Sequence, residues 1–258
     1  MKRQTWLIQV TIVAGFVLLW TLVSVSGIWF ERLFPTPWVV LIEAIKHLQQ
    51  GIIYPHFFYS AYEVLWGFLI GAGLGLALGL VLGSRRALGE IFEPLVLALA
   101  PVPKIIIYPV FLWFLGIGIY SRVAMGAAST FFPMVIYAAV SVRQVSPIHL
   151  EAARLLGASP WSLWTKIYMP AMLPYLWVGL RLGIAISIVG ILLAETKMSQ
   201  KGLGFLIIEY YTNFQITEMY AVLLLVFALA IAINSFLSWV QGRIPALRHG
   251  RQVRGGMF

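Results

Sequence analysis

Long apolar runs without charge constrain this chain more than any other feature of its sequence. The first run follows Lys2 and Arg3 and contains no charged residue before Glu31. A helix of about 20 apolar residues crosses the hydrocarbon core of a bilayer and satisfies its own backbone hydrogen bonds there. Hydrophobic residues make up 61% of the 258 residues, and charged residues 10%. The sequence therefore predicts an all-α, polytopic membrane protein.

The apolar runs predict six transmembrane helices in a single membrane domain that covers residues 1–258. We expect the spans at about 7–30, 61–83, 91–115, 120–142, 175–194 and 219–240. A signal peptide is the alternative for the first run, because Ser24-Val25-Ser26 is a small-x-small triplet, but the run is longer than the apolar core of a signal peptide. Residues 31–59 predict a short amphipathic surface helix, and residues 195–218 predict a polar outer loop.

The second predicted span carries glycines at a strict four-residue spacing, namely Gly67, Gly71, Gly75, Gly79 and Gly83. On a helix this spacing places them in one nearly straight groove. Such a groove lets another membrane helix approach closely and gain van der Waals contact. A dinucleotide-binding loop is the alternative for a glycine-rich stretch, but the GxGxxG spacing does not occur. We interpret these glycines as a helix-packing surface.

The third predicted span cannot be an unbroken helix, because it contains Pro94, Pro101, Pro103 and Pro109. Broken backbone at membrane depth is tolerated where it is buried in protein or lines a cavity. Lys104 lies in the same segment, and a cation there faces a partner, a cavity or the interface. We therefore expect Pro103, Lys104 and Pro109 near a solute pathway. The alternative for Lys104 is a side chain that snorkels to the interface.

The longest polar-containing segment between two apolar runs covers about residues 146–172, and we call it the elbow. Ser146-Pro147 and Ser159-Pro160 each place an N-cap side chain before a proline at the first helical position. Gly157 stands where a left-handed residue would end the first helix. Pro170 and Pro174 are expected to end the second helix. The elbow is therefore predicted to be a helix-turn-helix.

The first elbow helix carries apolar side chains on one face at helical spacing, namely Ile148, Ala152, Leu155 and Leu156. A helix of about ten residues is marginal alone in water. This face must therefore lie against another part of the protein or against another subunit.

The basic residues predict the orientation. With the N-terminus, residues 84–90, the elbow and the C-terminus on one side, that side carries eleven Lys and Arg and the other side five. The eleven are Lys2, Arg3, Arg85, Arg86, Arg143, Arg154, Lys166, Arg243, Arg248, Arg251 and Arg254, and the five are Arg32, Lys46, Arg122, Lys197 and Lys201. The positive-inside rule places the larger group, with both termini and the elbow, in the cytoplasm.

Several chemistries have no basis in the sequence. No GxxxxGK[ST] motif occurs, so the chain has no P-loop for a nucleotide. It has no cysteine and no HExxH, and its four histidines are scattered, so we expect no metal site and no catalytic residue. Glu63 and Glu195 near the outer ends of two spans are candidates for proton chemistry, but ion-pair or interfacial roles are favoured. Arg181 in the fifth span is interpreted as a scaffold contact.

The elbow resembles the EAA loop of permease subunits of ABC-type importers. The resemblance rests on Glu151-Ala152-Ala153, then Gly157, Ile167 and Pro170 at the family's spacing, with Met169 where the family pattern has leucine. Over residues 58–240 the chain is similar to the nitrate, sulfonate and taurine branch of that family. That similarity adds Arg85-Arg86, residues 101–104, Pro109 and residues 112–118.

The resemblance implies a type I ABC importer permease in the bacterial inner membrane, with a cytoplasmic coupling loop. The family's ATPase-coupling residues correspond here to Glu151, Ala152, Ala153, Leu156, Gly157, Ile167 and Pro170. It also implies two copies of an ATP-binding subunit that holds ATP and Mg, a second permease copy in a homodimer, an external solute-binding protein and surrounding lipid. No cofactor on this chain and no nucleic acid are expected.

The solute implied by this branch is a small anion of the sulfonate, taurine or nitrate kind. A pyrimidine vitamin precursor or an aromatic acid is the alternative within the family. From another class, an ATP-independent secondary transporter would need inverted repeats or paired intramembrane acids, and the sequence shows neither. A membrane-embedded enzyme would need convergent polar catalytic groups at depth, and none is evident.

Overall fold

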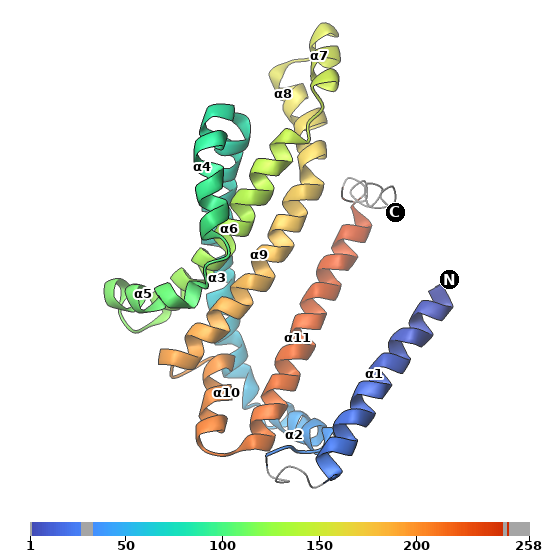
Figure 1. Ribbon diagram of the computed structural model, residues 1–258, viewed down its shortest axis with the longest axis vertical. Coiled ribbons are helices and arrows are strands. Elements are labelled where there is room, and N and C mark those ends of the chain that lie inside the picture. Colours follow the sequence, from blue (N-terminus) through green and yellow to red (C-terminus); the bar gives the residue numbers. More distant parts are fainter. Residues whose placement is uncertain (1, 27–32, 245–246, 248–258) are drawn as a thin grey trace.

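In the computed structural model, residues 2–26, 33–244 and 247 are described, and no strand occurs among them. Five helical segments are long and apolar enough to cross a membrane, and a bent pair of shorter helices makes a sixth candidate span. Figure 1 shows these helices as an elongated bundle with the elbow at one end. The prediction of an all-α membrane fold is confirmed.

Three helices form the centre of the bundle: α3 (Ile53–Ser84), α6 (Ile119–Arg143) and α9 (Met169–Met198). α6 packs against both α3 and α9. Their shared core consists of Ala72, Met134, Ala138, Val145, Met172 and Leu176, with partly buried neighbours such as Phe68 and Ile167. α3 begins at Ile53 rather than near residue 61, because residues 53–60 continue the apolar helix outward.

The regularly spaced glycines of α3 lie against α6. A Cβ added to Gly67 would stand 3.1 Å from backbone atoms of α6, and one added to Gly75 would stand 2.6 Å from the carbonyl oxygen of Phe131. Gly71, Gly79 and Gly83 face α6 in the same way. Only residues without a side chain allow two helices to approach this closely, and the close approach increases dispersion contact along the whole pair.

Two long helices flank this centre. α1 (Lys2–Val25) and α11 (Ile216–Arg243) are mostly exposed along their apolar lengths. The amphipathic helix predicted between the first two spans is present as α2 (Pro37–Gln49), which buries Val40, Ala44 and His47 at helical spacing and packs on α11. The end of the first predicted span, residues 27–30, and the basic tail at 248–254 lie outside the described residues.

The third span is broken, as predicted from its prolines. α4 (Arg86–Leu99) is followed by a 3₁₀ turn at Lys104–Ile107 and by α5 (Tyr108–Leu115), and the two arms differ in direction by 89°. α5 projects sideways from the bundle in Figure 1.

The prediction of a polar outer loop at residues 195–218 is wrong. α9 continues to Met198, and residues 203–212 form a further helix, α10 (Leu203–Thr212), which packs on α9 and α11. The charged residues suggested a loop, but the segment between them, Leu203 to Ile208, is apolar and buries Leu203 and Leu206 against the bundle.

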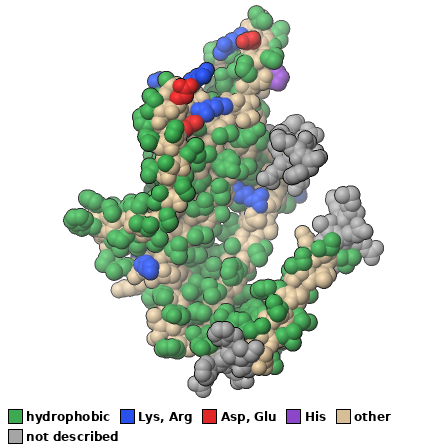
Figure 2. Space-filling view, in the orientation of Figure 1, with side chains coloured by type: hydrophobic (Ala, Val, Ile, Leu, Met, Phe, Trp, Pro, Cys, Tyr) green, Lys and Arg blue, Asp and Glu red, His purple; other side chains and the backbone are tan. Residues whose placement is uncertain are grey.

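The helix ends nearest the two termini share one side of the molecule with the elbow. The start of α1, the end of α11 and the elbow point toward the same end, and α2 and α10 lie at the other (Figure 1). Figure 2 shows most of the visible acidic and basic side chains near the elbow end, above a body covered by hydrophobic side chains.

Candidate functional site

The elbow extends beyond the bundle as two short helical pieces, α7 (Pro147–Leu155) and α8 (Pro160–Leu163), shown in Figure 1. Gly157 between them has φ +76, the left-handed conformation predicted for it. The N–H of Ala158 donates to Ala153 (3.0 Å) and that of Gly157 donates to Arg154 (3.0 Å). These two bonds form a Schellman motif, which satisfies carbonyls that the helix end would leave free.

The two predicted N-caps behave differently. The hydroxyl of Ser159 accepts a hydrogen bond from the N–H of Ser162 (3.2 Å), as expected for an N-cap. Ser146 occupies the N-cap position of α7, but its side chain makes no cap hydrogen bond. The start of α7 therefore depends on Pro147, whose fixed φ suits the first turn.

Pro170 and Pro174 do not end the second elbow helix, contrary to prediction. α8 passes through one π turn, Trp164–Tyr168, directly into α9, so Pro160–Met198 forms one helical segment. The N–H of Met169 bonds to the carbonyl of Trp164, five residues back. Pro170 then falls in the first turn of α9, where its missing N–H costs little. Ile167 is half-buried against the core of the bundle.

The apolar face of α7 has no partner among the described residues. Leu155 is 90% exposed, Leu156 is 88% exposed, and Ile148 and Trp161 are also exposed. Glu151 and Ala152 share this exposed helix, and Ala153 is partly covered. In Figure 1, α7 lies at one end of the molecule, away from the packed centre formed by α3, α6 and α9.

A cavity of about 430 Å³ lies beside the broken span, between residues 100–105, α6 and α9. Pro103 and Lys104 line it, together with Ser129, Phe132 and Tyr137 among others. Pro109 is exposed in the first turn of α5 and is not part of the lining. The structure thus brings Pro103 and Lys104 together at this cavity and leaves Pro109 outside it.

The ammonium of Lys104 is engaged by the backbone. It donates to the carbonyl oxygens of Leu99 (3.0 Å), Ala100 (2.9 Å) and Val102 (2.7 Å), and it lies 4.4 Å from the centre of the Phe132 ring. A helix that ends at membrane depth leaves carbonyls that lipid cannot satisfy. Lys104 therefore caps the end of α4, and its positive charge remains at the wall of the cavity.

A buried polar cluster was not anticipated from the sequence. Arg122, placed on the outer side in the orientation count, is 3% exposed and donates through Nε to Glu63 Oε1 at 2.6 Å. Glu195, also buried, accepts from Ser60 and from the backbone of Gly204. The sequence suggested an ion-pair role for Glu63, but it gave no signal that Glu63 and Glu195 would meet.

Arg181 has a side-chain partner on another helix. Arg181 donates to the side-chain oxygen of Asn234, which joins α9 to α11. In the part of the chain that the structure describes, no three His, Asp or Glu side chains cluster in a way that could hold a metal ion.

Comparison with known proteins identifies related transport proteins. Residues 71–246 match the family described as binding-protein-dependent transport system inner membrane component. A putative aliphatic sulfonates transport permease protein of Bacillus subtilis is 26% identical over 248 residues, which cover 96% of this chain and 90% of the relative.

Two further relatives carry other solutes in their names. A nitrate import permease protein of Synechocystis is 28% identical over 187 residues, or 72% of this chain and 68% of the relative. A bicarbonate transport system permease protein of Synechococcus elongatus is 26% identical over 243 residues, or 89% of this chain and 86% of the relative.

Proposed function

This chain belongs to the binding-protein-dependent transport system inner membrane component family and is a permease subunit of an ABC importer, and on that premise we propose that its solute is a small anion. The relatives are named for sulfonates, nitrate and bicarbonate, which are all small anions. Lys104 carries the only positive charge among the described residues that line the cavity beside the broken span. Its charge would favour an anion in that low-dielectric setting.

The elbow is proposed as the surface that binds the ATP-binding subunit. The observation that carries this proposal is the pair Leu155 and Leu156, which are 90% and 88% exposed on a capped helix outside the bundle. Exposed apolar side chains of this size are typical of protein interfaces. A capped helix of nine residues is also rigid enough to transmit a displacement, and α8 continues from it into α9.

A second permease copy is proposed on the side where α5 projects. Trp113 and Phe114 of α5 are 85% and 77% exposed, and the segments 100–103 and 116–118 around it are not helical. Lipid could cover the apolar rings, but it cannot hydrogen-bond to the backbone N–H and C=O groups of the non-helical segments. A protein surface can satisfy both, so we favour a protein partner here. The second copy would also close the open side of the cavity.

The proposed location is the bacterial inner membrane, with both termini and the elbow in the cytoplasm, where ATP is available. The excess of basic residues on that side supports the orientation. ATP and Mg would be held by the partner subunit, since this chain has no P-loop. A solute-binding protein would approach the opposite end, where α2 and α10 lie.

Reconstitution tests the function. The chain, the ATP-binding subunit and the binding protein encoded with it are placed in liposomes, and uptake of labelled ethanesulfonate, nitrate, bicarbonate and a pyrimidine is measured with and without ATP. We expect ATP-dependent uptake of a small anion. Preference for the pyrimidine would contradict the anion assignment, and equal uptake without ATP would contradict the importer mechanism.

Replacing Leu155 and Leu156 by Ser tests the coupling surface. Loss of one fully buried leucine costs about 1.5–3 kcal/mol, so binding of the ATP-binding subunit should weaken by about 10-fold or more per leucine. The permease alone should stay equally stable, because these side chains contact little within it. Leu41→Ser, an exposed leucine of α2 at the other end, is the matched control. Undiminished binding by the double variant would remove the elbow from the interface.

The second-copy surface is tested by disulfide cross-linking, since the chain contains no cysteine. Trp113→Cys should form cross-linked dimers in oxidised membranes. Phe227→Cys on α11, which is also exposed, is the control and should not. Cross-linking only at Phe227 would place the second copy on the other side.

A further inference from the structure

Side chains from α3 and α6 meet Glu195 of α9 and backbone N–H groups at the start of α10 in a cluster that is closed to solvent. Glu63 and Glu195 are both 0% exposed, and Arg122 and Ser60 are nearly as buried. Of the described carboxylates, these two glutamates are the only buried ones. Neither belongs to the elbow or lines the cavity beside Lys104.

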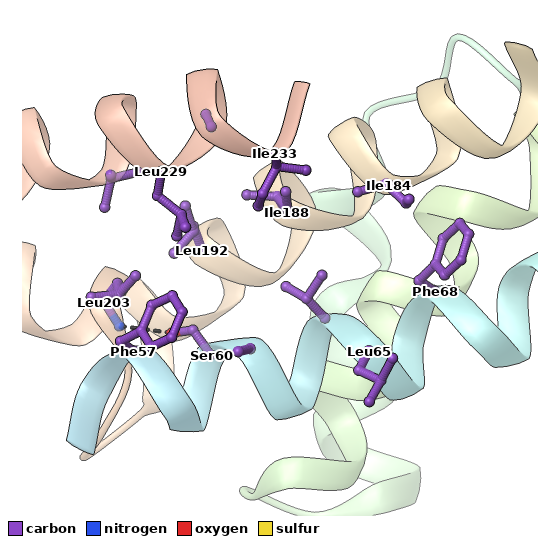
Figure 3. A pocket seen from close by; sticks show the side chains of 14 residues that line it. Phe57, Ser60, Leu65, Phe68, Ile184, Ile188, Leu192, Leu203, Leu229 and Ile233 are labelled. Carbon is purple, nitrogen blue, oxygen red and sulfur yellow. Dashed lines mark hydrogen bonds between the residues drawn. The ribbon is translucent and has the colours of Figure 1, made fainter. Parts of the chain in front are cut away.

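The contacts within the cluster are short and specific. Arg122 binds Glu63 through Nε (2.6 Å), the hydroxyl of Tyr59 (2.7 Å) and the carbonyl of Met198 (3.2 Å). Ser60 donates to Glu195 Oε1 (2.6 Å), and the N–H of Gly204 donates to Glu195 Oε2 (2.7 Å). The hydroxyl of Ser60 also accepts from the N–H of Leu203 (2.8 Å), the dashed bond in Figure 3.

The charges of the cluster do not balance if both acids are ionised. It contains two carboxyl groups and one guanidinium, and Glu195 has hydrogen-bond donors but no cation of its own. An uncompensated charge is strongly disfavoured in a site that water does not reach. Two carboxylates buried in one such site retain one proton between them, because the single guanidinium compensates only one negative charge.

One unpaired atom marks where this proton belongs. Glu63 Oε2 is buried and has no partner among the heavy-atom hydrogen bonds, although Oε1 of the same group binds Arg122. Ser60, one helical turn before Glu63 on α3, donates to Glu195 Oε1, so the two buried carboxyl groups belong to the same polar cluster. A proton between the two groups would give Oε2 of Glu63 the bond that it lacks.

We propose that Glu63 and Glu195 form a proton-binding site that holds one proton between them. With Arg122, the cluster then has no net charge, and it joins the ends of α3, α6 and α9 to the start of α10. The proton belongs to the pair rather than to either residue. The other titratable groups that face the pair are Arg122 on α6, Tyr59 and His56 on α3, and Tyr108 on α5.

The surrounding backbone is built closely around this pair. A Cβ at Gly202 would overlap the carboxyl group of Glu195, and one at Gly204 would stand 2.9 Å from its Cβ. His56 binds the backbone of Gly202 through Nδ1 (3.1 Å to the carbonyl oxygen). The start of α10 therefore stands directly on Glu195, and its docking depends on the state of that carboxyl group.

Infrared spectroscopy of the purified full-length permease, with Glu63→Gln and Glu195→Gln variants, tests the site. The wild type should show a carbonyl band of a protonated carboxylic acid at neutral pH, equivalent to one group per chain. Each single variant leaves one carboxyl group and one guanidinium in the cluster, so ionisation of that carboxyl group no longer leaves an uncompensated charge and the band should disappear. In Glu195→Gln the remaining Glu63 keeps its bond to Arg122, and in Glu63→Gln the guanidinium of Arg122 is released from that bond. Glu151→Gln, an exposed glutamate of the elbow, is the control and should keep the band.

A band that is absent from the wild type, or that persists in both variants, would overturn the proposal. A second measurement remains informative even if one variant folds poorly. A glutamate in the unfolded chain has a pKa near 4.3. Above that pH the unfolded chain is ionised at both positions, so unfolding releases the proton that the folded pair holds. Stability of the wild type should therefore fall with rising pH, by up to about tenfold in the unfolding equilibrium per pH unit. The variant that folds should lack this part of the slope, and an unchanged slope would refute the shared proton. Neither readout depends on which solute is transported.

Discussion

Replacing Gly75 by Ala should separate α3 from α6, whereas replacing Gly73 by Ala in the same helix should not. The added Cβ at Gly75 would lie 2.6 Å from the carbonyl oxygen of Phe131 and 2.8 Å from the Cβ of Met134. At Gly73 it would meet nothing within 4 Å. The two substitutions are chemically identical and two residues apart, so they differ only in the face of α3 that they alter.

The expected magnitudes follow from these distances. A Cβ closer than 3.0 Å to backbone requires the helices to move apart, and overpacking of this kind costs about 1–3 kcal/mol. Gly73→Ala has no such cost, and the helix gains up to about 1 kcal/mol from the lost freedom of glycine. For a chain of this size, 1 kcal/mol corresponds to about 2–4 °C in Tm.

Thermal unfolding of the purified variants in detergent, followed by tryptophan fluorescence, measures the difference. Gly75→Ala should unfold several degrees below the wild type, and Gly73→Ala should match or exceed it. Uptake in liposomes should follow the same order. If both variants unfold at the same temperature as the wild type, the close approach of α3 and α6 does not contribute to stability and the packing argument fails.

Three further substitutions test other parts of the structure. At Gly157 a side chain would meet nothing within 4 Å, so only the left-handed backbone opposes substitution. Gly157→Val should cost about 1–2 kcal/mol and lower ATP-driven uptake while membrane insertion persists, whereas Gly157→Asn should stay near wild type. Equal activity of the two variants would count against the elbow. Lys104→Gln should reduce anion uptake more than the amount of protein in the membrane, and equal losses of both would restrict Lys104 to its capping role. Arg122→Gln leaves Glu63 buried without its cation, so we expect a loss of about 3–5 kcal/mol and little assembled protein in membrane fractions, and normal assembly would show that the ion pair is dispensable.

Features fixed by local pattern could be predicted from the sequence. Spans follow from the length of apolar runs, the break in the third span from its prolines, and the turn at Gly157 from its place between two helix starts. Each depends on residues that are consecutive or nearly consecutive in the chain. The same is true of the glycine spacing, although the sequence could not say that α6 is the helix that packs there.

Features that depend on distant residues or on helix continuity could not be predicted. Arg122 and Glu63 are 59 residues apart in sequence, and nothing local signals their pairing. The search for paired intramembrane acids therefore missed Glu63 and Glu195. Pro170 was expected to end a helix, but the π turn before it places the proline in a first turn, and that shift in hydrogen bonding leaves no clear pattern in sequence.

The continuity of Pro160–Met198 connects the two polar ends of the molecule. This single helical segment begins in the elbow and carries Glu195 in its last turn, so at 1.5 Å per residue it extends over about 58 Å. A displacement of the elbow would therefore reach the outer cluster along one helix, with no loop to absorb it. The cluster holds that far end against α3 and α6, through the hydrogen bond from Ser60 to Glu195 and the bond from Arg122 to the carbonyl of Met198. A helix interrupted at Pro170 would have ended this connection about three turns after Pro160, so the proposed coupling through α9 depends on the π turn as well as on the elbow.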